Sequence, residues 1–135
     1  MLANSFTIMR HPPELVEYLE SLAKRNVAFI NSALTHGGFL VGGKFFDYRE
    51  IDPDDPSDQE HIQWREKFTQ LCADMDVLPY EACVAFGISH PATTSIALSS
   101  SRPERTADMI RATTQVIDPK FWDALRDSGL ATTQW

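Results

Sequence analysis

The sequence has 135 residues, of which 43% are hydrophobic and 23% charged, proportions typical of a globular domain rather than of a disordered, collagen-like or coiled-coil chain. A chain of this length supports one hydrophobic core, so any function must fit on one domain or on part of one. Twelve basic against nineteen acidic residues give a net charge of -7, and most of the acidic excess lies in residues 47–60. Because no basic surface remains to follow phosphates, the composition argues against nucleic acid and anionic membranes as partners.

The cysteines and the amino-terminal residues bear on the compartment. Cys72 and Cys83 lie in segments predicted to be buried helix, and the sequence has no second pair for a disulfide framework or a metal. The first ten residues carry neither a basic leader nor a long apolar run, and no stretch of the sequence is long and apolar enough to cross a membrane. We therefore expect a cytoplasmic protein.

Strands and helices are expected to alternate in the first part of the chain. Apolar residues at positions 6–9 predict a short strand, and residues 12–26 predict a helix, with prolines in its first turn and leucines at helical spacing. The apolar run 27–30 is typical of a parallel strand covered on both faces. The glycine-rich and then acidic residues 34–58 predict a long loop.

The remaining elements follow the same logic. The expected elements are an amphipathic helix over residues 62–75, a buried helix over 79–89 and a strand over 93–98. Ser101 and Glu104 have the spacing of a capping box at the start of the next helix. Asp118 is placed to cap the last helix, and Gly129 is placed to end it.

The order of elements, without a hairpin signal between strands, indicates the parallel α/β class. Three parallel strands leave two unpaired sheet edges. A complete (β/α)₈ barrel needs roughly 250 residues. We therefore expect residues 1–135 to form a single incomplete domain, which is either the closing third to half of such a barrel or a unit that completes itself by association.

The junction after the third expected strand carries the strongest local signal for a binding site. Small hydroxyl side chains at residues 99–101 allow a ligand to approach the backbone, and a helix start presents unpaired N–H groups. Arg102 or Arg105 can form paired hydrogen bonds with phosphate oxygens. The pattern predicts an anion site. The alternative is a capped helix start with two solvated arginines, which needs no ligand.

Residues 31–38 follow the second expected strand, at the end where α/β proteins bind their ligands. Their glycines allow a ring or a pyrophosphate to lie against the backbone, although a plain glycine-rich turn is the alternative. His36 has the chemistry of an acid or base, but no carboxylate or nucleophile stands at a fixed spacing from it. We therefore do not expect His36 to be catalytic.

A metal site is not expected. Four acidic residues of the loop have the character of calcium ligands, but the loop lacks the glycine of an EF-hand and contains prolines instead; they are Asp52, Asp54, Asp55 and Asp58. The pattern favours a solvated acidic loop. The histidines have no ligand spacing, and Cys83, among apolar neighbours, is expected to be an inert core residue.

Six segments in order resemble the C-terminal part of the aldo/keto reductase family, most closely its NAD(P)-dependent aldose dehydrogenases for fucose, galactose or arabinose. They are ANSFTIM, VAFINSALTHGGFLVGG, the acidic loop into the helix ending QLC, LPYEACVAFGISHP, TTSIALSSSRPER and DPKFWDALRDSGL. The resemblance implies an α/β fold that is a partial (β/α)8 TIM barrel, with about three C-terminal βα units corresponding to strands six to eight. It also implies hydride transfer between a substrate carbon and NAD or NADP.

The resemblance further implies two groups of cofactor contacts. The residues on the loop that passes the nicotinamide and the pyrophosphate are Ser32, Ala33, Leu34 and Thr35. The residues that hold the phosphates and the adenosine end are Ser99, Ser100, Ser101, Arg102, Arg105 and Asp108. The family's catalytic Asp, Tyr, Lys and His belong to earlier strands and match nothing in this sequence, so no catalytic residue is assigned.

Three functions are compatible with these observations. The first is the cofactor-binding fragment of an NAD(P)-dependent aldose-type dehydrogenase, inactive by itself and completed by the missing N-terminal part of the barrel. The second is a non-catalytic truncated homologue that self-associates through its incomplete barrel. The third is a generic phosphate-ligand module that uses the serine-rich loop.

Overall fold

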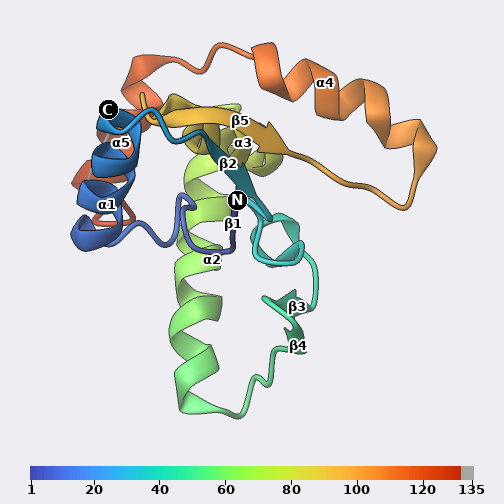
Figure 1. The fold of residues 1–135 in the computed structure, drawn as a ribbon. Coiled ribbons are helices and arrows are strands. Elements are labelled where there is room, and N and C mark those ends of the chain that lie inside the picture. Colours follow the sequence, from blue (N-terminus) through green and yellow to red (C-terminus); the bar gives the residue numbers. More distant parts are fainter. Residues whose placement is uncertain (132–135) are drawn as a thin grey trace.

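The computed structural model describes residues 1–131, and a three-stranded sheet lies at its centre (Figure 1). The strands are β1 (Leu2–Ala3), β2 (Phe29–Ser32) and β5 (Thr93–Ala97), in the spatial order β1-β2-β5. Both pairings are parallel, so each connection is a crossover that runs through helices. This arrangement confirms the predicted α/β class.

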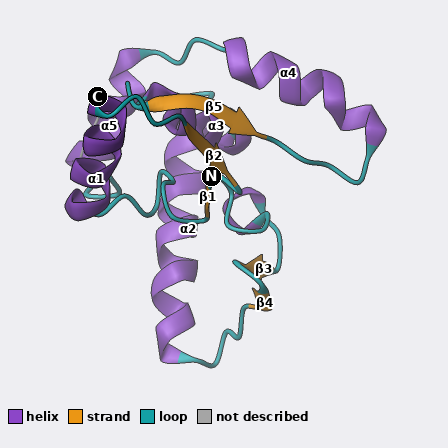
Figure 2. Cartoon of the chain, viewed as in Figure 1, coloured by secondary structure: helices purple, strands orange, loops and turns teal. Residues whose placement is uncertain are grey.

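Helices occupy the connections and the C-terminal part of the described chain (Figure 2). The helices are α1 (Pro13–Lys24), α2 (Pro56–Asp74), α3 (Pro79–Ser89), α4 (Thr106–Thr114) and α5 (Pro119–Asp127). Two short 3₁₀ turns add to them, η1 (Phe39–Val41) and η2 (Pro103–Arg105). α1 joins β1 to β2, whereas η1, a small hairpin, α2 and α3 join β2 to β5.

Proline and aspartate define the helix starts. α1, α2, α3 and α5 each have proline in the first turn, where a missing N–H costs no helical hydrogen bond. Asp55 caps α2 by accepting from the amide of Ser57 at 2.8 Å, and Asp118 caps α5 by accepting from Lys120 at 2.9 Å. The predicted cap at Asp118 is therefore confirmed. Gly129 follows α5 with φ +71°, which confirms its predicted role at the helix end.

The first predicted strand is wrong, because residues 6–9 form a bend and β1 lies earlier, at Leu2–Ala3. The backbones of Thr7 and Arg10 bond to each other in both directions, at 2.7 and 3.0 Å, and this tight turn prevents an extended chain. Phe6 and Ile8 are fully buried. These residues are therefore apolar because they are buried in the core, and not because they pair in a sheet.

The second predicted strand is shifted by two residues, from 27–30 to 29–32. Its expected burial on both faces is also wrong, because Ile30 is 38% exposed. Asn31 on the opposite face is fully buried against the helices. One face of the sheet is thus covered within the described residues, and the other is open.

The long loop contains a hairpin that the sequence did not indicate. β3 (Phe45–Phe46) and β4 (Arg49–Glu50) pair antiparallel around a two-residue turn that starts at Asp47, and they lie outside the main sheet (Figure 2). Asp47 has φ +56°, a conformation that aspartate tolerates better than most residues. The turn thus needs no Asn-Gly pair, which is why the sequence pattern missed it.

The predicted capping box is wrong. Ser101 and Glu104 do not start a helix; instead η2 forms first and α4 begins at Thr106 without a side-chain cap. The hydroxyl of Ser100 accepts from the amide of Arg102 at 3.0 Å. The proline at position 103 favours this local turn because it fixes the backbone before the helix.

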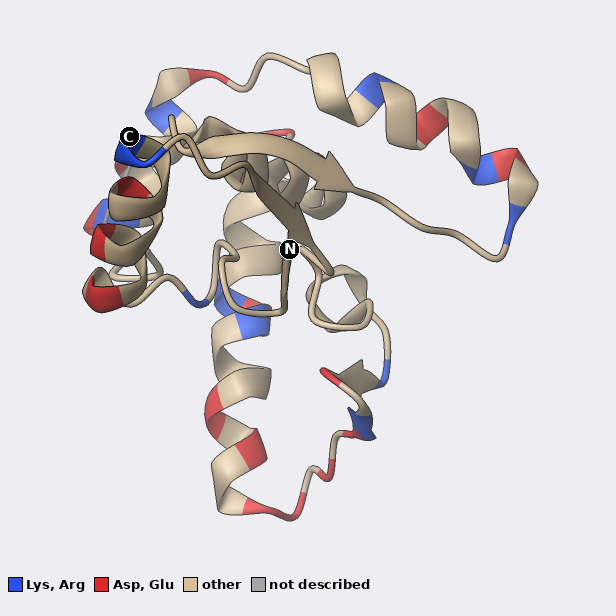
Figure 3. Ribbon diagram, in the orientation of Figure 1, with Lys and Arg blue, Asp and Glu red and all other residues tan. Residues whose placement is uncertain are grey.

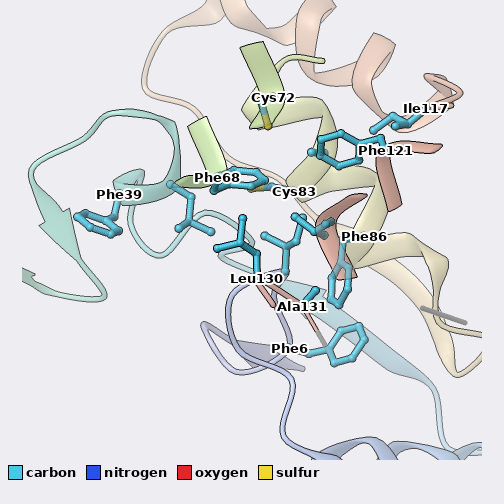
Figure 4. Close-up of a cluster of buried hydrophobic side chains, with 14 of the residues drawn as sticks. Phe6, Phe39, Phe68, Cys72, Cys83, Phe86, Ile117, Phe121, Leu130 and Ala131 are labelled. Atoms are coloured by element: carbon cyan, nitrogen blue, oxygen red, sulfur yellow. The ribbon is translucent and has the colours of Figure 1, made fainter. Parts of the chain in front are cut away.

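The core lies where α2, α3 and α5 pack under the sheet (Figure 4). Its largest buried aromatic side chains are Phe6, Phe39, Phe68, Phe86 and Phe121. Cys72 and Cys83 are buried in it, and burial raises the pKa of both thiols, that of Cys72 to about 12. Both are protonated at neutral pH, so the prediction that Cys83 is an inert core residue is confirmed.

Candidate functional site

The carboxyl ends of β2 and β5 lie side by side and define the place for a ligand. Ser32 pairs in register with Ala97, so the segments that follow the two strands leave the sheet at the same edge. In open parallel sheets, ligands bind outside the carboxyl ends of the strands. The structure thus brings to one edge the two segments that the sequence marked as cofactor-binding.

A cleft of about 300 Å³ opens beside the segment that follows β5. It is lined by Val41, Leu78, Tyr80, Glu81, Ser99, Ser100, Arg105, Asp108, Met109 and Arg111. These residues come from η1, the start of α3, the β5–α4 connection and α4. Four of the predicted contacts, Ser99, Ser100, Arg105 and Asp108, therefore share one cavity.

The cleft combines two cations with two carboxyl side chains. Arg111 forms an ion pair with Asp108 at 2.9 Å across one turn of α4, and both side chains are well exposed. Within the described part of the chain, Arg105 forms no ion pair, so its guanidinium is open to a ligand anion. The densest run of acidic residues lies at the other end of the molecule, around the loop that precedes α2 (Figure 3). The cleft itself contains both signs of charge, since Glu81 and Asp108 line it together with the two arginines.

The serine-rich segment is accessible. Residues 99–101 are exposed, and Ser100 closes a local turn with the backbone of Arg102. Ser101 and Arg102 are exposed too, but neither lines the cleft. An exposed backbone with short hydroxyl side chains lets a phosphate approach closely.

The four predicted contacts on the loop after β2 do not line the cleft. Ser32 is buried and donates to the carbonyl of Leu2 at 2.8 Å, which ties β2 to β1. Leu34 is buried in a small cluster with Val84 and Ala112, where it anchors the loop to α3 and α4. Ala33 and Thr35 are half-buried. The loop reaches the cleft only further along, through Val41 in η1.

His36 has the carboxylate partner that the sequence did not reveal. Its Nδ1 lies 2.6 Å from Oδ1 of Asp47, and its Nε2 lies 2.8 Å from the hydroxyl of Thr7. The β3–β4 turn places Asp47, eleven residues after His36, next to the imidazole. This separation along the chain does not correspond to a fixed-spacing motif. Sequence spacing alone therefore could not identify this partner. Because its side chain is fully buried, the residue has no access to a substrate.

Asn4 is a candidate that the sequence reasoning missed. It follows β1, has φ +54° and is 5% exposed, and its Oδ1 has no hydrogen-bond partner among the described residues. A buried amide oxygen without a partner is costly in a folded protein unless a ligand or another segment satisfies it. No signal in the sequence distinguishes this asparagine from an ordinary turn residue.

No group of three or more His, Cys, Asp or Glu side chains in the described chain is arranged to hold a metal ion. The four loop aspartates do not converge, because Asp58 is buried against Arg49 while Asp55 caps α2. None of the described helices is long and apolar enough to span a membrane.

Fold and cleft together define an α/β protein with its ligand site at the carboxyl ends of parallel strands. The model of the aldo/keto reductase family matches residues 1–129, and the chain belongs to this family of oxidoreductases. Over 134 residues it is 27% identical to pyridoxal 4-dehydrogenase of Microbacterium luteolum, a match that covers 96% of this chain and 37% of that enzyme. The chain thus spans little more than a third of that relative's length.

Family membership confirms the resemblance seen in the sequence, while the closer likeness to aldose dehydrogenases is not confirmed. Aldo/keto reductases as a family use nicotinamide cofactors, and the cleft suits the phosphate-bearing part of one. Its volume of about 300 Å³ is at the lower end for ligand cavities, and its unpaired arginine and short hydroxyls are groups that bind phosphate. The residues present therefore fit part of a dinucleotide.

Proposed function

We propose that this chain supplies the nucleotide-binding part of an NAD(P)-dependent aldo/keto reductase and corresponds to strands six to eight of a (β/α)₈ barrel. The observation that carries the proposal is the convergence of Ser99, Ser100, Arg105 and Asp108 on one cleft. The cleft lies where β2 and β5 end, the usual ligand position in parallel α/β folds.

Each group has a distinct role in this proposal. The guanidinium of Arg105 and the hydroxyl of Ser99 bind phosphate oxygens, for which they supply donors at neutral pH. Ser100, whose hydroxyl bonds to the backbone of Arg102, shapes the turn beside them. Arg111, held by Asp108, faces the adenosine end. The arginines suit the 2′-phosphate of NADP, and the carboxylate of Asp108 suits the ribose hydroxyls of NAD. NAD and NADP therefore both remain candidate cofactors.

When bound, the nicotinamide exchanges a hydride with a carbon of the substrate. The side chains of this chain hold the dinucleotide, and no catalytic residue is assigned to it, because the family's catalytic Asp, Tyr, Lys and His match nothing in this sequence. We propose a polar alcohol or aldehyde as substrate, with an aldose as the first choice. The pyridoxal named for the relative is the competing substrate. The 135-residue chain alone is predicted to be inactive with either.

Arg105→Ala tests the proposal, with Arg25→Ala as the matched control. Loss of a charge-assisted hydrogen bond costs about 1.5–3 kcal/mol, so calorimetry should show roughly 10- to 100-fold weaker binding of NAD⁺ or NADP⁺. Arg25 lies at the end of α1, outside the cleft, and its loss should leave the affinity unchanged. Equal affinities of the two variants would contradict the proposal.

A second candidate, self-association of a non-catalytic chain, is favoured by the open sheet. Within residues 1–131, β1 and β5 are each paired on one side only, and Ile30 is 38% exposed on the open face. Sedimentation velocity separates the candidates. A stable oligomer that binds neither dinucleotide supports self-association, and a nucleotide-binding monomer supports the reductase fragment.

A further inference from the structure

One buried imidazole connects the loops at the ligand edge of the sheet. His36 bonds to Asp47 in the hairpin turn and to Thr7 in the loop after β1. Phe46 stacks on the imidazole at 4.7 Å with an interplanar angle of 8°. Arg10 completes the group, because its guanidinium donates to Asp47 and to the carbonyl of Asn4 at 3.3 Å. A single side chain thus links the segments that follow β1 and β2 to the hairpin.

The hydrogen bonds fix the proton state of this imidazole. The hydroxyl of Thr7 accepts from the amide of Arg10 at 3.0 Å, so its own proton is free to point to Nε2 of His36. Nδ1 then carries the imidazole proton and donates to Asp47. In this arrangement the imidazole is neutral, with Nδ1 donating to Asp47 and Nε2 accepting from the hydroxyl of Thr7.

The loop that His36 holds has an unfavourable backbone conformation. Ala33 and His36 have φ of +53° and +51°, and Gly37, Gly38 and Gly42 are also in the left-handed region. Two non-glycine residues in this region store strain that the surroundings must offset. The amide of Asp47 bonds to the carbonyl of His36 at 3.3 Å, so main chain and side chain anchor the same point.

The same loop forms one wall of the cleft. Val41 lines the cleft, and the backbone turn from Gly38 to Gly43 that carries it is closed by a hydrogen bond of 2.8 Å. Burial of Leu34, Phe39 and Leu40 also holds this loop, and the guanidinium of Arg65 donates to the carbonyl of Gly43 at 3.1 Å. His36 adds the polar anchor, whose hydrogen bonds depend on the protonation of its ring.

We propose that His36 is the positioning residue of the nucleotide cleft, its neutral imidazole holding residues 33–43 in the conformation that places Val41 at the cleft wall. This inference rests on the proposed function for the identity of the ligand. It assigns a role to a histidine that does not touch the ligand. It also makes the shape of the cleft depend on whether His36 is protonated.

Three ionisable groups face the imidazole from the elements packed around it. They are Asp47 from the hairpin turn, Arg10 from the loop after β1, and His61 from α2, whose ring contacts Phe46. Burial lowers the pKa of His36, and this effect outweighs the opposing effect of Asp47. The neutral state therefore prevails at and above the ordinary histidine pKa, and protonation in more acidic solution removes the Nε2 lone pair that accepts from Thr7.

The test measures the affinity for NADP⁺ and NAD⁺ in four variants, after circular dichroism has shown each to be folded. His36→Leu and Thr7→Val remove the bonds, and we expect binding at least about tenfold weaker in both at pH 8. His36→Gln offers one donor and one acceptor and should restore most of the affinity. His61→Gln changes a ring that contacts Phe46 but bonds to neither His36 nor Thr7, and it should bind like the wild type.

The pH profile separates a positioning role from a merely structural one. Wild-type affinity should fall as the pH decreases through the acidic side of 6.5, the ordinary histidine value, and His36→Gln should be flat over that range. The ¹⁵N signals of the imidazole should show a proton on Nδ1 at pH 8. Identical pH profiles for the two proteins, or full affinity in a folded His36→Leu variant, would overturn the inference.

A wild-type protein that binds neither dinucleotide would overturn the proposed function instead. The role of His36 is then decided by hydrogen exchange at the amides of Val41 and Gly43, which the turn protects. Faster exchange in His36→Leu but not in His61→Gln supports the anchor. Unchanged exchange in both contradicts it.

Discussion

Ser32 and Ala97 are paired positions on the neighbouring parallel strands β2 and β5. Sixty-five positions apart in sequence, they start two segments that leave the sheet together, one toward η1 and the other toward the serine-rich turn. The pairing explains how residues that are far apart in the sequence can line the same cleft. It also means that the cleft depends on the register of two strands only four and five residues long.

Gly37→Ala should be far more damaging than Gly129→Ala. Both glycines have nearly the same φ, +70° and +71°, so either substitution incurs about 1 kcal/mol of backbone strain. A Cβ at Gly37 would also lie 2.8 Å from the carbonyl oxygen of Asp47, whereas none of the described atoms lies within 4 Å of a Cβ at Gly129. Overpacking adds about 1–3 kcal/mol at position 37.

Urea unfolding of the two glycine variants measures this difference directly. The free energy of unfolding should fall by roughly 2–4 kcal/mol in Gly37→Ala and by about 1 kcal/mol in Gly129→Ala. Equal losses would show that the hairpin turn moves away from the loop at little cost.

Asp58 should contribute to stability at neutral pH and lose that contribution in acid. It is buried, and the guanidinium of Arg49, followed by the amide of Asp52, lowers its pKa to about 2. Because the folded state holds the proton less tightly than the unfolded state, the contribution is complete above the ordinary value of 3.8 and is lost as the pH falls toward 2. Asp58→Asn should lack this step.

Urea titrations between pH 5 and pH 2 test the role of Asp58, with exposed Asp54→Asn as the control. The stability gap between wild type and Asp58→Asn should narrow as the pH falls, while Asp54→Asn should follow the wild type. A gap that is constant with pH would contradict the account.

Phe121→Ala should detach α5 from the core. Phe121 is fully buried, and replacing such a ring by alanine costs about 3–5 kcal/mol. Phe45→Ala is the matched control because that ring is 50% exposed, and its cost should stay within about 0.5 kcal/mol. Thermal unfolding of both variants provides the comparison, and a small loss in Phe121→Ala would show that α5 contributes little to the fold.

Sequence patterns predicted the elements whose determinants are local. The helix starts at Pro13, Pro79 and Pro119 follow from proline geometry, and the cap at Asp118 from its side chain. Strand positions were less well predicted, because a strand depends on its partner. Residues 6–9 carry the apolar pattern, yet Leu2–Ala3 pairs with β2.

The candidate site likewise contains some features that the sequence predicted and others that it did not. The segments after β2 and β5 were recognisable from their composition, and four residues of the second segment do line the cleft. Leu34 is predicted to contact the cofactor, and its side chain is buried against α3 and α4, a packing that the sequence pattern does not show. The His36–Asp47 pair depends on a hairpin turn that sequence spacing does not signal.

The central claim is that this chain binds the phosphate-bearing part of a nicotinamide dinucleotide. Calorimetric titration of the wild-type protein with NAD⁺, NADP⁺ and adenosine tests it most directly. We predict saturable binding of at least one dinucleotide at one site, with adenosine at least about tenfold weaker because it lacks the phosphates that we propose Arg105 to bind. Absence of dinucleotide binding, or adenosine binding with equal affinity, would contradict the account.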